Sequence, residues 1–188
     1  MRWTHKLIRE VAQEERGALG LGPFDEFDPY ALAAAYGISV YTLSDLRDWD
    51  LPTEVHEHFH QSSGTWSAAL IPIGSARLIV EHDGHALVRR RASIAHELGH
   101  HLLEHPFNAA LLGENHQRLF DKAKERQADI LAGELLIPQR AAQRAAFEGW
   151  SNREVALTFG VSEQYAQMQM SGPRVRADRA NRKYGRRT

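Results

Sequence analysis

Two histidines and a glutamate near the middle of the chain have the types and spacing of a metal-dependent hydrolytic site. They belong to the run His96-Glu97-Leu98-Gly99-His100. On a helix of about 3.6 residues per turn, residues four apart project from one face, so His96 and His100 could hold one zinc ion. Glu97 would lie about 100° around the helix, close enough to activate a water beside the metal without binding the metal. The pattern predicts a zinc peptidase.

The neighbouring residues indicate that this helix packs against the rest of the protein. Its apolar flank consists of Ile94, Ala95, Leu98, Leu102 and Leu103. A glycine inside a helix costs roughly 0.5–1 kcal/mol relative to alanine. Gly99 is therefore easier to explain by the close approach of another segment than by packing alone.

A catalytic zinc site needs three protein ligands and one open position, so a third ligand must come from elsewhere. The extension His-x-x-Gly-x-x-His fails, because Leu103 and Pro106 stand where its glycine and its last histidine would be. An inverted motif, His101-Leu102-Leu103-Glu104-His105, remains an alternative register. The two histidine pairs could not both face one site, since adjacent helical residues diverge by about 100°.

The favoured third ligand comes from a later helix. Glu125 lies 25 residues after His100, and Asp129 follows one turn later on the same face. Glu125 could bind zinc while Asp129 hydrogen-bonds the outer nitrogen of a ligand histidine, which fixes the orientation of that ring. The alternative is a solvated helix face with two acidic residues.

Composition limits the other possibilities. The chain has 188 residues, of which 43% are hydrophobic and 25% are charged, as is typical of a soluble globular protein. With no cysteine it can form neither a disulfide nor a thiolate zinc site, so a metal must be held by His, Asp or Glu. No apolar run reaches membrane-spanning length and no signal peptide opens the chain, so we expect a cytoplasmic protein. The alternating His56, His58 and His60 lack a carboxylate partner and are interpreted as part of a solvated loop.

The charge is unevenly distributed. From Gly172 onward the chain carries seven cations and one carboxylate, so this end is +6 and the remainder is −7 for a total of −1. We expect residues 172–188 to form a flexible basic tail after a domain of residues 1–171. The alternative is an arm that contacts nucleic acid or an acidic partner.

Hydrophobic periodicity and turn signals predict an α+β fold, in which a short antiparallel sheet around residues 38–82 packs on the motif helix. Asp28-Pro29 and Ser151-x-x-Glu154 are helix-start signals. The expected helices cover residues 4–16, 29–36, 89–104, 121–137, 139–147 and 151–159, and the expected strands cover 38–43, 66–73 and 76–82.

Two blocks of the sequence resemble the ImmA/IrrE family of metallopeptidases. Residues 89–100, Arg-Arg-Arg-Ala-Ser-Ile-Ala-His-Glu-Leu-Gly-His, are similar to the family block R-x-R-F-T-x-A-H-E-L-G-H. Residues 125–138 resemble the block E-x-E-A-N/D-x-F-A-A-x-L-L-M-P. The resemblance covers roughly residues 28–170. The departures are Ala92 and Leu131 in place of phenylalanines and Gln127 in place of the second glutamate.

This resemblance implies a minimal zincin-like fold of gluzincin type and a zinc-dependent endopeptidase. It further implies that the substrate is a helix-turn-helix repressor, cleaved in transcription regulation and stress response. Carried over by position, His96 and His100 bind the metal with Glu125, and Glu97 is the general base. Residues 139–171 would form the C-terminal helical part of the domain.

A rival hypothesis arises from residues 152–170, which resemble a helix-turn-helix pair. If the pair bound DNA, its second helix would carry cations for phosphate contacts, but residues 163–170 include one glutamate and no Lys or Arg. Direct DNA binding is therefore disfavoured. A non-catalytic antirepressor, which sequesters a repressor or DNA and keeps zinc only for structure, remains the alternative to a peptidase.

Overall fold

The computed structural model describes residues 3–46, 66–106 and 121–185. The chain divides into two compact units, one of residues 1–11 and 28–132 and the other of residues 12–27 and 133–188. The first unit holds the sheet and the HExxH helix, and the second holds the C-terminal helices. The alternating His56, His58 and His60 lie outside the described residues. No described helix combines the length and apolarity that a membrane crossing requires.

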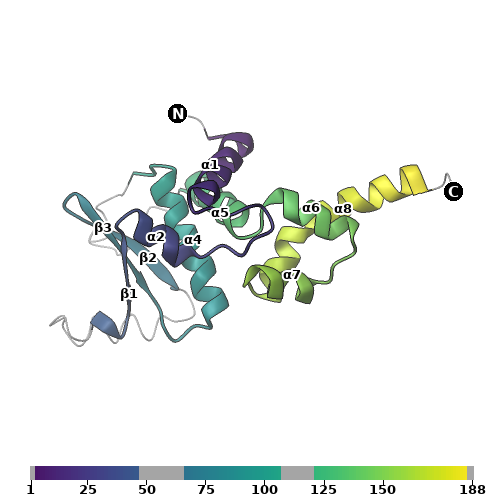
Figure 1. The fold of residues 1–188 in the computed structure, drawn as a ribbon. Helices are drawn as coiled ribbons and strands as arrows, with labels where there is room; N and C mark the ends of the chain where they lie inside the picture. Colours follow the sequence, from purple (N-terminus) through teal and green to yellow (C-terminus); the bar gives the residue numbers. More distant parts are fainter. Residues whose placement is uncertain (1–2, 47–65, 107–120, 186–188) are drawn as a thin grey trace. The chain divides into compact units, whose positions relative to one another are not determined.

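A three-stranded sheet forms the frame of the first unit (Figure 1). Its strands β1 (Ser39–Thr42), β2 (Ala68–Ile73) and β3 (Ala76–Glu81) lie in the order β1-β3-β2. The strands expected over residues 66–73 and 76–82 are present and form a hairpin: β2 pairs antiparallel with β3, and the turn places Gly74 at a φ of 58°, which favours glycine. The α+β class is confirmed.

The sheet is mixed, whereas we expected it to be antiparallel throughout. β1 runs parallel to β3, with Ser39 opposite Leu78 and Thr42 opposite Glu81. A two-residue turn forces β2 and β3 into opposite directions, but β1 precedes β2 by a long connection that leaves its direction free. Tertiary packing therefore decides the direction of β1.

One edge of the sheet is formed by β2, and its backbone groups alternate in direction. Ser67 accepts a hydrogen bond from His82 N, so Ser67, Ala69 and Ile71 point their backbone groups toward β3. The backbone groups of Ala68, Leu70 and Pro72 then point away from the sheet. Proline fits this outward position because it has no N–H to leave unpaired.

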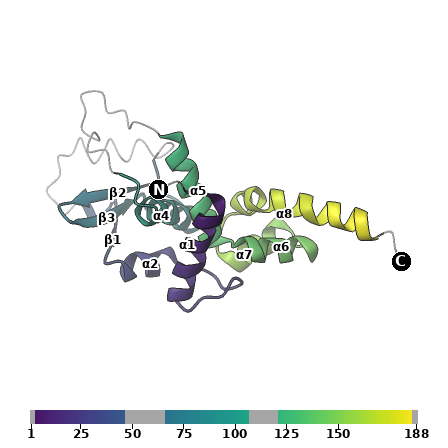
Figure 2. The ribbon, with the colours of Figure 1, turned by 90° about the horizontal axis from the view of Figure 1, so that it is seen from above.

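Two helices pack on the sheet, α2 (Pro29–Ala35) and α4 (Leu87–Leu102), and α4 runs alongside β2 and β3 (Figures 1 and 2). Asp28 caps α2 as predicted, since its carboxylate accepts a hydrogen bond from Tyr30 N. The α4–sheet core includes the fully buried Leu70, Ile79, Ile94 and Leu98.

A buried charged cluster joins α2, β3 and α4. Glu81 is only 1% exposed, and its carboxylate accepts hydrogen bonds from Tyr30 Oη at 2.9 Å and from the Arg90 guanidinium. Burial and the hydrogen bond to Glu81 raise the pKa of Tyr30 to about 12. Glu81 is thus a buried charge with a cationic partner and a second donor, which is the arrangement that makes such burial tolerable.

The helix α5 (Lys122–Leu136) begins after Asp121, whose carboxylate accepts a hydrogen bond from Ala123 N. Within the first unit, α5 crosses α4 closely at Gly99. A Cβ atom on Gly99 would lie 2.9 Å from the carbonyl oxygen and 3.0 Å from the Cα of Ala128. The close approach expected from Gly99 is therefore that of the α5 backbone.

The second unit contains the end of α1 (His5–Ala18), together with α6 (Gln139–Phe147), α7 (Asn152–Phe159) and α8 (Glu163–Tyr184). The predicted capping box at the start of α7 is present, with Ser151 and Glu154 bonded reciprocally. Gly160 ends α7 at a φ of 61°, and Ser162 caps α8. The α7–α8 pair therefore has the three-residue turn of a helix-turn-helix.

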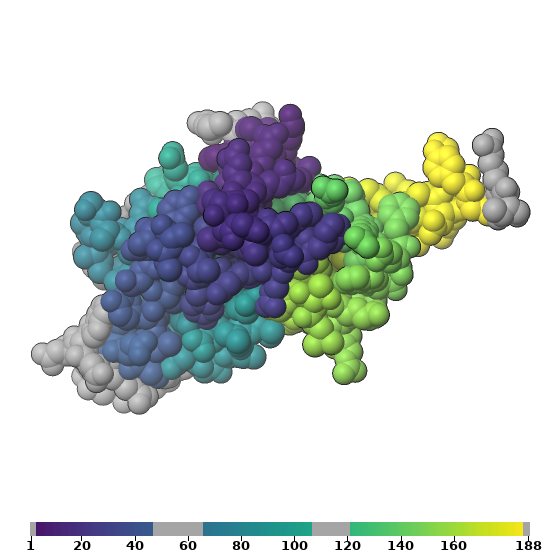
Figure 3. Space-filling model, viewed as in Figure 1, coloured from purple at the N-terminus to yellow at the C-terminus, as the bar shows by residue number. Residues whose placement is uncertain are grey.

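The basic end of the chain is not a separate segment where the structure describes it, because α8 continues to Tyr184 (Figure 1). We expected a flexible tail from residue 172 onward, and a proline inside a helix removes one hydrogen bond. Pro173 is buried, and the preceding residue is a glycine, whose missing Cβ relieves the clash that normally keeps residues before proline out of a helix. The last turns of α8 extend beyond α6 and α7 and are exposed (Figures 1 and 3).

Candidate metal centre

The two motif histidines lie one turn apart on α4 and point their Nε2 atoms at each other, 3.1 Å apart. From α5, the Glu125 carboxylate oxygen Oε2 lies 3.2 Å from His96 Nε2 and 3.5 Å from His100 Nε2. All three groups are largely buried, with side-chain exposures of 22%, 11% and 17% for His96, His100 and Glu125. The structure thus brings together the three residues that the sequence spacing suggested.

This cluster fits a tetrahedral metal ion. An ion held at about 2.0–2.2 Å from each ligand atom would set those atoms about 3.3–3.6 Å apart, because a tetrahedron's edge is about 1.6 times its centre-to-corner distance. The three observed distances of 3.1, 3.2 and 3.5 Å are close to this range. Among the described residues, the side chains of His96, His100 and Glu125 form a group of three that lie close enough together to share an ion.

Asp129 supports the cluster from the next turn of α5. Its Oδ1 lies 2.9 Å from His96 Nδ1, the nitrogen on the far side of the ring from Glu125. Burial disfavours a charged His96, but hydrogen bonds to Asp129 and Glu125 outweigh it and raise the pKa of His96 to about 9. A bound cation would replace that proton, since the same carboxylates that attract a proton attract a metal.

Glu97 lies on the sheet side of the cluster. Its side chain is buried, with the residue only 4% exposed, and its Oε2 accepts a hydrogen bond from Leu70 N at 3.0 Å. The Leu70 N–H is one of the backbone groups of β2 that point away from the sheet, so the edge of the sheet holds the Glu97 carboxylate in place. Glu97 also raises the pKa of His96 through its charge, which places it within electrostatic reach of the cluster.

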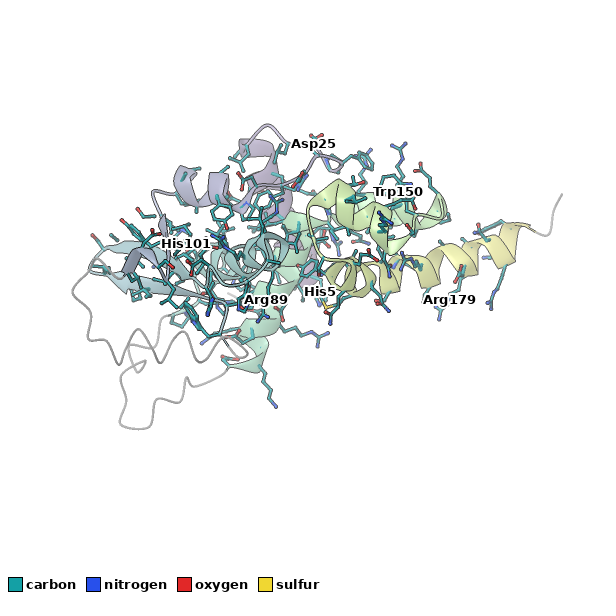
Figure 4. All side chains as sticks on the ribbon, turned by 90° about the horizontal axis from the view of Figure 1, so that it is seen from below. His5, Asp25, Arg89, His101, Trp150 and Arg179 are labelled. Atoms are coloured by element: carbon teal, nitrogen blue, oxygen red, sulfur yellow. The ribbon has the colours of Figure 1, made fainter. Side chains whose placement is uncertain are left out.

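A surface cleft of about 310 Å³ opens onto these groups. His96, Glu97 and Asp129 line it together with Ala68 of the β2 edge and with Arg89. The Arg89 guanidinium, labelled at the start of α4 in Figure 4, donates two hydrogen bonds to Ser67 Oγ across the cleft. The cleft therefore exposes one candidate metal ligand, the Glu97 carboxylate and the edge of β2 side by side.

The inverted motif does not form a second site. His101 has other partners: its Nδ1 accepts a hydrogen bond from Arg77 at 2.8 Å, and its ring lies edge to face with that of Tyr36. His105 instead contacts His100, with 3.0 Å between the two Nδ1 atoms, and its Nε2 lies 3.0 Å from Gln127 Oε1.

The contact of His105 with His100 was not anticipated from the sequence. The inverted motif pairs His105 with His101, whereas the fold pairs it with His100. A glycine after the helix would have indicated a turn of this kind in the sequence. The left-handed position is instead occupied by Glu104, so the sequence offered little indication of the turn.

The α+β fold and the two-helix His/His/Glu cluster together define a small protein of the zincin-like class. The chain belongs to the Peptidase_M78 family, because the family model of the IrrE N-terminal-like domain matches residues 33–171. The expected membership of this family is thereby confirmed. A comparison with curated proteins finds no match.

Proposed function

We propose that this protein is a zinc-dependent endopeptidase. The observation that carries the proposal is that the His96, His100 and Glu125 side chains form a cluster able to hold an ion, beside a cleft lined by His96 and by the buried carboxylate of Glu97. His96, His100 and Glu125 would hold the metal, and Asp129 would orient the His96 ring. Two imidazoles and one carboxylate are a donor set that zinc uses in peptidases, and they leave a fourth position open.

When bound, zinc would supply a lowered pKa for a water molecule and polarisation of the scissile carbonyl. The protein's own contribution is general acid–base catalysis by Glu97. Its carboxylate would take the proton from the attacking water and deliver it to the amine that leaves. Leu70 N–H donates a hydrogen bond to this carboxylate, which keeps it oriented.

A substrate in extended conformation would fit the edge of β2. Leu70 N–H is bonded to Glu97, but the C=O of Leu70 and both backbone groups of Ala68, which lines the cleft, point outward from the sheet. An incoming peptide could pair with these groups as an added strand, which would lay its backbone across the candidate ion site. This arrangement favours an unfolded or flexible segment of a protein as the substrate.

The natural substrate we propose is a helix-turn-helix transcriptional repressor, cleaved in the cytoplasm to relieve repression under stress. This part of the proposal comes from the resemblance of residues 89–100 and 125–138 to the ImmA/IrrE blocks. A gene for such a repressor beside the gene for this chain would support it.

The second candidate function is a non-catalytic antirepressor. It is favoured by the α7–α8 pair, which exposes Leu157 and Met168 as apolar contacts for a protein partner. Direct DNA binding is less favoured, because the first two turns of α8 carry Glu163 and no cation.

A Glu97→Gln variant separates the two functions. If the protein is a peptidase, this variant should bind zinc and the repressor but lose both cleavage and release of the repressor from DNA. A matched control is Glu163→Gln, which makes the same change on an exposed helix of the other unit. Undiminished repressor release by Glu97→Gln would support the antirepressor instead. Undiminished zinc content in His96→Ala or Glu125→Ala would contradict the metal site.

A further inference from the structure

The end of α4 has a specific geometry that brings His105 onto His100. Glu104 has a φ of 52°, in the left-handed region. His105 N donates to His100 O at 3.0 Å, and Glu104 N donates to His101 O at 3.1 Å. These two bonds are the Schellman arrangement, which closes a helix and turns the chain back over its last turn.

In a Schellman turn the residue after the left-handed position packs on the residue five positions earlier. That contact is usually between two apolar side chains, but in this protein the pair consists of His105 and His100. The rings meet edge to face with centroids 5.0 Å apart, and His105 is only 7% exposed. The helix-ending turn therefore serves as a support for a candidate metal ligand.

The hydrogen-bond directions along this contact are fixed by the chemistry of its two ends. If His100 Nε2 offers its lone pair to a metal, the ring's hydrogen lies on Nδ1, so His105 Nδ1 must accept it. His105 then carries its own hydrogen on Nε2. The partner of that nitrogen is Gln127 Oε1, an amide oxygen that can only accept. The metal at one end of this row of hydrogen bonds and Gln127 at the other thus require the same tautomers of His100 and His105.

We propose that His105 and Gln127 are positioning residues that set the tautomer and orientation of His100 for metal binding. The inference rests on the metal site of the proposed function, but it does not depend on peptidase activity. Glu125 and Gln127 both come from the first turns of α5, so this helix supplies a metal ligand and the terminal acceptor of the relay. Asp129 does for His96 what the His105–Gln127 relay does for His100.

The test compares zinc affinity in matched pairs of variants, with Zn²⁺ as the probe and a chromophoric chelator as the competitor. His105→Phe keeps a ring without an acceptor and should weaken zinc binding about 10–100-fold. His105→Asn places an amide oxygen near the position of Nδ1 and should recover part of that loss. Gln127→Met removes the acceptor at similar size and should weaken binding, whereas Gln127→Glu restores an acceptor and should bind as tightly as the wild type.

Two further measurements separate positioning from a general structural effect. His101→Phe changes the neighbouring histidine of the same turn and should leave zinc affinity unchanged. In ¹⁵N-labelled, zinc-loaded protein, imidazole NMR should place the His100 hydrogen on Nδ1 in the wild type, and this signal should shift in Gln127→Met.

The inference would be overturned if both His105→Phe and Gln127→Met bound zinc as tightly as the wild type. It would also be overturned if His101→Phe weakened binding as much as His105→Phe. A wild-type protein that takes up no zinc would contradict the metal site itself, and so would remove the basis of the proposed function as well. Gln127→Met alters a partly exposed residue, so it keeps the test decisive if His105→Phe fails to fold.

Discussion

Replacing Gly99 with alanine tests whether the close crossing of α4 and α5 is what holds the site together. Helix propensity alone favours the change, since alanine is better than glycine inside a helix by about 1 kcal/mol. The added Cβ, however, would lie 2.9–3.3 Å from three backbone atoms of Ala128. Because ordinary contacts begin near 3.4 Å, α5 would have to move by several tenths of an ångström.

The crowding should outweigh the propensity. Overpacking of this kind typically costs about 1–3 kcal/mol, so we expect Gly99→Ala to lower the free energy of unfolding by about 1 kcal/mol after the helical gain is subtracted. The displaced helix carries Glu125, so zinc affinity should fall as well. Denaturant unfolding of the metal-free protein and chelator competition measure the two effects.

Gly133→Ala provides the matched control within α5. The three atoms nearest to its Cβ would all belong to the side chain of Gln169, the closest at 2.6 Å, and a flexible glutamine can move aside. This variant should be neutral or slightly stabilising and should retain zinc affinity. A Gly99→Ala protein that is as stable as the wild type, with unchanged zinc affinity, would refute the reasoning that Gly99 is required by backbone contact.

Two other predictions concern pH and the end of α4. In the metal-free protein, burial would lower the pKa of His96, but its hydrogen bonds to Asp129 and Glu125 outweigh burial and raise the pKa to about 9. Protonated His96 therefore stabilises the fold fully below about pH 6.5, and this stabilisation is lost as pH rises through about 9. Urea unfolding at intervals across this range should show a decrease of about 3 kcal/mol that is missing in His96→Ala, and an equal decrease in both proteins would contradict the assignment. Glu104→Gly relieves a left-handed φ of 52° and should raise the unfolding free energy by up to about 1 kcal/mol without altering zinc affinity. Thermal denaturation measures this gain, and a lower melting temperature would argue against the Schellman turn.

Much of the candidate site was accessible from the sequence, because its parts are local. His96 and His100 are set by the helical period, and Glu125 and Asp129 by the same period on the next helix. Helix starts at Asp28 and Ser151 were predicted for a similar reason, since a capping side chain bonds to backbone within three residues of itself. Such patterns need no knowledge of the tertiary fold.

The features that the sequence did not reveal are of two kinds. Some depend on contacts between distant segments, and in others tertiary packing outweighs the usual preference of a residue type for a backbone conformation. The direction of β1 is decided by its packing beside β3 across a long connection. The helix continues through Pro173 because a buried ring and a preceding glycine offset the lost hydrogen bond. His105 reaches His100 through a turn with glutamate, where glycine would have signalled the geometry.

The buried pair of Arg90 and Glu81 has a consequence for the angle at which α4 presents its side chains. Each residue along a helix rotates the projecting side chain by about 100°, so a slip of one position would turn His96 away from α5. Arg90 precedes His96 by six residues, and its guanidinium is fixed to a strand that cannot rotate. The salt bridge thus fixes the rotation of α4 about its own axis. It lies almost two turns from His96, and it keeps both histidines facing Glu125.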